Sequence, residues 1–149
     1  MGVYNGAQAY RNSVLGGAVS KSTGTLTNAT LPLFTIAGGL VAVTSITGRV
    51  TTAVTVANSY KLQHNPTAGT TVDLCAATDI GTTDTAVGEI FVVSGVRATG
   101  LTVGANPRVA GLQIMDVGQI EHVSAGTDGV ILWTVTWVPI ENGATLVAA

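Results

Sequence analysis

Apolar and polar residues alternate over much of the chain after residue 30, which is the pattern of half-buried β-strands. The clearest case is the segment 130–140, where every second residue is large and apolar. These apolar residues are Ile131, Trp133, Val135 and Trp137. We expect them to form a buried stripe, in a sandwich core or at a subunit interface.

A second alternating segment runs from residue 40 to residue 56. Its Ser, Thr and Arg residues fall on one predicted face, and its apolar residues fall on the other. The apolar residues are Leu40, Ala42, Ile46, Val50, Val54 and Val56. Gly48 lies near the middle of this segment, and glycine inside a strand is typical of a bend or a β-bulge. We therefore predict one long strand with a bulge at Gly48.

Shorter strands and turns fill the rest of the chain. The apolar run 33–37 ends at Gly38-Gly39, a dipeptide that favours a tight hairpin. Strands are also predicted at 59–64, 70–76, 89–94 and 117–123, and no window of ten residues has a helical stripe. Short strands separated by turns indicate an all-β fold, which we expect to be an antiparallel β-sandwich or barrel.

Residues 1–30 differ from the β domain predicted over residues 31–149. They contain few periodic apolar positions, and residues 20–30 are rich in Thr and Ser. We predict an extended N-terminal arm that contacts a neighbouring molecule. Its anchors would be Tyr4, Tyr10, Val14 and Leu15. The alternative is that this segment forms the first strand of its own sandwich.

Low charge is the main compositional feature of the 149 residues. Only 9% are charged, against about 25% in typical proteins, the net charge is −2 and mean hydropathy is +0.48. A surface made of Thr, Ser, Ala and Gly repels copies of itself weakly, which favours self-association. Six Lys and Arg residues argue against nucleic-acid binding. The longest apolar stretch, 31–43, is too short and too interrupted for a membrane helix.

Few residues could carry catalysis. His64 and His122 are the only histidines, and Cys75 is the only cysteine, so no disulfide can form within the chain. A Cys75–His64 pair is conceivable if their strands are hairpin partners, but no third group is placed to orient the imidazole. We therefore expect no enzyme activity and no cofactor.

Two binding alternatives stay open at this stage. Asp73, Asp79, Asp84 and Glu89 lie in a region rich in Gly and Thr, where carboxylates can hold calcium. Trp133 and Trp137 lie four positions apart on one strand face and could stack against a sugar, as in a carbohydrate-binding β-sandwich.

The chain resembles the capsid decoration (cement) proteins of tailed bacteriophages. The resemblance is carried by its overall composition, the opening Tyr4-Asn5-Gly6-Ala7-Gln8-Ala9-Tyr10, the Thr-rich segment 20–30, and the segment Lys61-Leu62-Gln63-His64-Asn65-Pro66. It implies a non-enzymatic β-rich subunit, often a homotrimer, that binds the major capsid protein on the virion exterior after synthesis in the host bacterial cytoplasm. Tail-tube and tail-fibre modules are also β-rich and self-associating, and they remain an alternative. The resemblance implies no catalytic or metal-binding residues, and no nucleic-acid or membrane partner.

Overall fold

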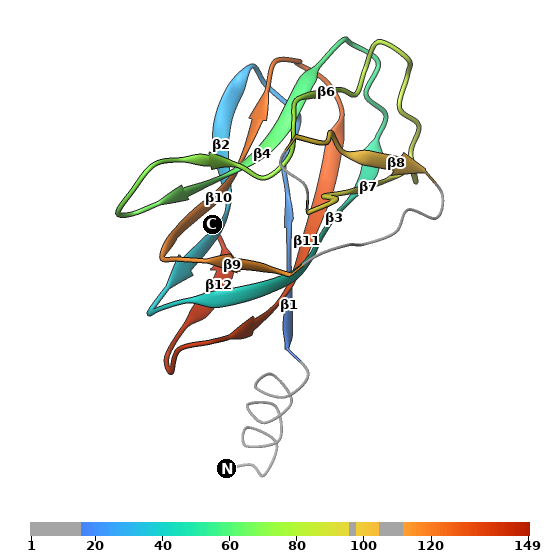
Figure 1. The fold of residues 1–149 in the computed structure, drawn as a ribbon. Coiled ribbons are helices and arrows are strands. Elements are labelled where there is room, and N and C mark those ends of the chain that lie inside the picture. The colour runs from blue at the N-terminus through green and yellow to red at the C-terminus, as the bar shows by residue number, and fades with distance from the viewer. Residues whose placement is uncertain (1–15, 96–97, 105–111) are drawn as a thin grey trace.

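The computed structural model describes residues 16–95, 98–104 and 112–149, and these form two antiparallel β-sheets packed as a sandwich (Figure 1). Sheet A consists of β1 (Gly17–Ser22), β3 (Val41–Thr52), β7 (Ile90–Val92), β8 (Thr102–Gly104), β9 (Gln113–Met115) and β11 (Val130–Pro139). Sheet B consists of β2 (Ala29–Ala37), β4 (Ser59–Pro66), β5 (Val72–Asp73), β6 (Thr78–Asp79), β10 (Gly118–Ser124) and β12 (Thr145–Ala148). The predicted all-β sandwich is confirmed.

The strand order shows that neighbours in sequence often lie in different sheets. Sheet A has the order β1-β11-β3-β7-β8, with β9 pairing the first residues of β3. Sheet B has the order β12-β2-β10-β4-β5, with β6 also pairing β4. Gly38 and Gly39 have φ values of +77° and +139°, but they join β2 of sheet B to β3 of sheet A. The expected hairpin at these glycines is therefore wrong, because the turn links the two layers instead.

The pairing of β3 with β11 has the longest register among the described strands, and it shifts at two places. Ser45 pairs with Thr136 and Val43 pairs with Trp137, so Thr44 is an extra residue, and Thr51 is likewise extra between Val50 and Thr52. Neither shift is at Gly48, where the sequence analysis predicted a bulge. Gly48 has a different role, because a Cβ there would lie 3.0 Å from atoms of both Trp133 and Ile131. The absence of a side chain at Gly48 lets the Trp133 indole lie flat against β3.

Four aromatic rings form a column through the core from sheet A to sheet B. Phe91 on β7 stacks on Trp133 of β11 with ring centroids 6.4 Å apart, and Trp133 stacks on Tyr60 of β4 at 6.1 Å. The Trp133 Nε1–H also donates a 2.8 Å hydrogen bond to the Tyr60 hydroxyl. Tyr60 in turn stacks on His122 of β10, with centroids 5.6 Å apart. This aromatic column joins the two layers by contacts that are both apolar and directional.

The predicted boundary between arm and domain at residue 30 is wrong for the described residues 17–30. All of β1 pairs with β11, from Gly17 opposite Trp137 to Ser22 opposite Leu132. Leu26 is fully buried in the core, and its backbone N–H donates to Gly129 O at 2.9 Å. The segment therefore forms the first strand of its own sandwich, which was the alternative reading. Residues 1–15 lie outside the described residues.

The burial of the two tryptophans predicts different costs of truncation. Trp133 is 0% exposed and holds the aromatic column, whereas Trp137 is only partly buried against the core. We expect Trp133→Ala to lower the free energy of unfolding by about 3–5 kcal/mol. We expect Trp137→Ala to cost less than half as much. Urea unfolding of the two variants checks this, and equal losses would contradict the placement of the two rings.

Candidate functional site

The stripe predicted over 130–140 lies mainly in the core. Ile131, Trp133 and Val135 are fully buried there, while Trp137 lies at the margin beside β1. Both tryptophans were predicted interface residues. Trp133 is instead a core residue, whereas Trp137 is partly accessible to solvent. A sugar-stacking platform needs both indoles exposed, so this pair does not form one. Tyr4, Tyr10, Val14 and Leu15 lie outside the described residues.

Cys75 and His64 lie near the same hairpin but bond to different backbone groups. The Cys75 Sγ accepts a hydrogen bond from Leu62 N–H at 3.4 Å, and burial raises the pKa of this thiol. The His64 Nε2 lies 3.0 Å from Asp116 O, and burial lowers the pKa of this imidazole. Both groups are thus held in their neutral forms at neutral pH. β4, which carries His64, pairs with β5, but Cys75 lies two residues beyond the end of β5, and no hydrogen bond joins its thiol to His64.

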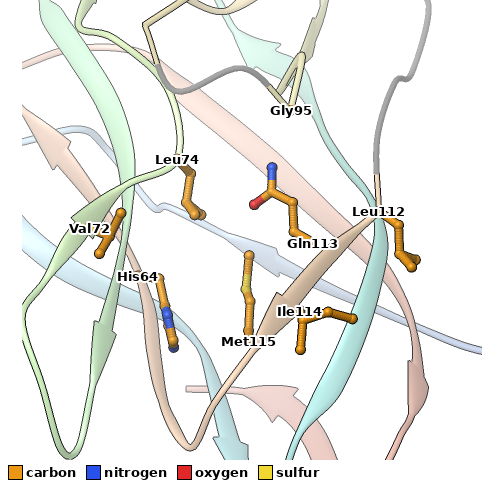
Figure 2. Close-up of a pocket in the computed structure, with 8 residues that line it drawn as sticks. All are labelled: His64, Val72, Leu74, Gly95, Leu112, Gln113, Ile114 and Met115. Carbon is orange, nitrogen blue, oxygen red and sulfur yellow. The ribbon is translucent and has the colours of Figure 1, made fainter.

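His64 lines a cavity of about 280 Å³ between β4, β5 and β9 (Figure 2). The other lining residues are Val72, Leu74, Gly95, Leu112, Gln113, Ile114 and Met115. Figure 2 shows Gln113 and Met115 on the inner side of β9, with Leu112 and Ile114 on its other side. Among the lining residues, no carboxylate or second imidazole stands beside His64. The cavity has room for a small group, but its lining residues offer no acid–base pair.

Two of the carboxylates that suggested a calcium site, Asp73 and Asp79, bond to neighbouring groups of the chain. Asp73 forms a 2.8 Å ion pair with Lys61. The Asp79 carboxylate accepts from the Thr82 hydroxyl and from the backbone N–H groups of Gly81, Asn58 and Thr82, which lower its pKa to about 2. Within residues 16–95, 98–104 and 112–149, no three His, Cys, Asp or Glu side chains converge as metal ligands. The same part of the chain has no helix long and apolar enough to cross a membrane.

The outer face of sheet A carries two groups of hydrogen-bonded hydroxyl side chains, which together we call the hydroxyl face. Ser20 on β1 bonds to Thr134 on β11 at 2.7 Å, and Thr136 on β11 bonds to Thr44 and Ser45 on β3 at 2.6 and 2.5 Å. The hydroxyl of Thr47 donates to Thr134 O. The members of the hydroxyl face are Ser20, Thr44, Ser45, Thr47, Thr134 and Thr136. Because each side chain is tied to a neighbour, this face is ordered before any partner arrives.

An apolar row borders the hydroxyl face at one end. Ile114 on β9 pairs with Ala42 on β3, and Ala42 pairs with Val138 on β11, so their side chains lie side by side on the outer face. Ile114 is 56% exposed. Over all the outer positions of β1, β3, β7, β9 and β11, the one charged side chain is Arg49. This face therefore costs little free energy to remove from water.

Sheet B has a different outer face, with charges at its centre. Lys61 and Asp73 form the ion pair across β4 and β5. Glu121 on β10 accepts hydrogen bonds from Gln63 at 2.6 Å and Asn65 at 3.0 Å. Among the described strand residues, the outer face of sheet B therefore carries more charged side chains than that of sheet A.

Sequence reasoning identified the polar stripes of 40–56 and 130–140 but not the hydroxyl face that they build. The face depends on β3 and β11 being neighbours, in the register that places Thr136 opposite Ser45. The Thr-rich composition was the only signal of it. A search of family models, of curated proteins and of solved structures found no match to the chain.

His122 gives a prediction for the pH dependence of stability. It is 1% exposed, its Nδ1 has no hydrogen-bond partner among the described residues, and burial lowers its pKa to about 4. The unfolded chain binds this proton near pH 6.5, so protonation favours unfolding. Stability should be full above pH 6.5 and should fall as the pH drops toward 4, by about 3 kcal/mol at the limit.

Urea unfolding between pH 7 and pH 4 measures this effect. The matched control is His122→Phe, which keeps a ring against Tyr60 but cannot take up a proton. The variant should lose most of the pH dependence in this window. If the free energy of unfolding of the variant falls with pH as steeply as that of the parent, the acid sensitivity belongs to other groups.

Proposed function

We propose that this chain is a non-enzymatic structural subunit of a virion, a decoration (cement) protein that binds the major capsid protein on the shell exterior. The hydroxyl face of sheet A, with its bordering apolar row, is the surface that would contact the shell. The observation that carries the proposal concerns the described strand residues, of which only Arg49 is charged at the outer positions of β1, β3, β7, β9 and β11, in contrast to sheet B.

The chemistry of the hydroxyl face supports a protein partner. Its hydroxyl groups can bond to backbone and side-chain groups of another protein, and neutral hydrogen bonds exchange for water at little net cost. The apolar row of Ala42, Ile114 and Val138 adds a hydrophobic border. Interfaces between proteins are depleted in charge at their centre, and this face has the same composition.

The size of the face also supports stable docking. β11 has 10 residues. Four strand widths by that length give an area of about 600 Å². A standard interface buries about 800 Å² on each partner, so this face supplies most of one. We propose that copies form a homotrimer on the shell, each presenting sheet A to it and sheet B to solvent.

A tail-tube or tail-fibre module is the alternative that the same observations support. Such a module would also need low charge and a flat sheet face. It would stack into rings or fibres in the absence of any shell, whereas a decoration subunit would stay a small oligomer. The particle size of the isolated chain separates the two.

Charge placed on the hydroxyl face tests the proposal. Ala18 and Thr44 are exposed on that face, so Ala18→Glu and Thr44→Glu add a carboxylate without emptying the core. We expect each to weaken binding to shells assembled from the major capsid protein of the same genome by at least about 10-fold, since a charge desolvated without a partner costs 1–3 kcal/mol or more. Co-sedimentation with these shells measures the affinity.

The matched control is Thr30→Glu, which adds the same charge to an exposed position on β2 of sheet B. It should bind the shells like the parent. Equal weakening by all three variants would point to a general charge effect. A parent chain that binds no shell, or that forms tubes alone, would overturn the proposal.

A further inference from the structure

The two sheets end side by side at β1 and β12, and a groove of about 550 Å³ lies there. It is lined by Gly16, Gly17, Ala18, Val19, Trp137, Leu146 and Val147, none of which is charged. Lys21 on β1 donates a hydrogen bond to the backbone oxygen of Ala149, which ties the two edges together beside the groove. We call this feature the edge groove.

Both strands beside the edge groove are paired on one side only within the described residues. β1 is the last strand of sheet A and pairs with β11, and β12 is the last strand of sheet B and pairs with β2. Each therefore presents backbone N–H and C=O groups that a further extended segment could pair. Among the described residues, no acceptor bonds to Trp137 Nε1, although this donor lies at the groove beside Gly17.

The chain itself contains a segment that fits this groove. Fifteen residues precede Gly16, the first described residue, and Gly16 lines the groove. They include Val3, Tyr4, Tyr10, Val14 and Leu15, and Arg11 is their one charged residue. An uncharged groove with free strand edges suits an extended, nearly uncharged segment with two aromatic side chains.

We propose that the edge groove binds residues 1–15 of a second copy of this chain. Figure 1 shows that the N-terminal end of β1 leads away from the sandwich. The preceding residues of the same copy would have to reverse direction at Gly16 to enter their own groove, whereas those of a neighbouring copy approach freely. This inference names the contact that holds the proposed oligomer together, and to that extent it rests on the proposed function.

Two full-length variants test the two partners of this contact separately: the copy that supplies residues 1–15 and the copy whose groove binds them. Tyr4→Ser with Tyr10→Ser removes the aromatic anchors of the segment and leaves the groove intact. Val147→Glu places a charge in the groove at a residue that is 52% exposed, so the fold should tolerate it. Val87→Glu is the matched control, because Val87 is 61% exposed on a loop away from the groove.

Iodide quenching of tryptophan fluorescence reports whether the groove is occupied. Trp133 is fully buried, so iodide reaches Trp137 alone, and Trp137→Phe should abolish the quenching. In the parent chain, the quenching constant should fall several-fold as the concentration rises through the assembly transition seen by sedimentation velocity. The Val87→Glu control should behave in the same way.

Mixing the two defective variants gives the decisive result. Alone, each should stay monomeric with Trp137 open to iodide at every concentration. Mixed, the intact segment of the Val147→Glu copy should enter the intact groove of the copy that lacks the tyrosines. This restores association and protects Trp137 of that copy alone, because the groove of the Val147→Glu copy stays empty. Protection in the monomeric parent, or parent-like association of either variant alone, would overturn the inference.

The outcome also distinguishes this inference from the proposed function. Shell binding that is lost in Thr44→Glu, whose site lies outside the groove lining, together with groove variants that associate like the parent, would leave the proposed function standing and remove the inference. If the two variants associate only when mixed but the parent chain binds no shell, the inference stands and the proposed function is removed.

Discussion

The contact between Trp133 and Tyr60 is the interaction on which the rest of the sandwich depends. It joins β11, the strand with the longest pairing in sheet A, to β4 of sheet B through a stacked pair of rings and a buried hydrogen bond. Phe91 and His122 extend the column to β7 and β10. With so few aromatic residues in the chain, this column supplies much of the large, specific packing that aligns the two layers.

The aromatic column also explains how a chain with so little charge presents two different faces. The bulky side chains are used between the sheets, and small hydroxyl residues cover the outside of sheet A. Gly48 belongs to the same arrangement, because a side chain there would push the Trp133 ring away from β3. The side chains of the hydroxyl face bond to one another and to the backbone, while the ion pair and Glu121 lie on sheet B. The proposed docking through sheet A rests on this division.

Alternation in the sequence predicted strands at 59–64, 117–123 and 130–140, and the structure has strands at 59–66, 118–124 and 130–139. The alternation pattern failed to predict features that depend on which strands pair with each other. Gly38-Gly39 allows a turn of either kind, and only the packing of the layers selects a link between sheets. β1 was missed because its inward residues, Gly17, Val19 and Lys21, give little apolar signal. The hydroxyl face and the edge groove were beyond prediction for the same reason, since each needs residues from several distant strands.

The hydrogen bond at the centre of the column tests this account most directly. Tyr60→Phe keeps the stacked ring but removes the acceptor, so the Trp133 Nε1–H stays buried without a partner. Urea unfolding should show a loss of about 1–3 kcal/mol with an unchanged dependence on urea concentration. A variant as stable as the parent would contradict the claim that this contact holds the two sheets together.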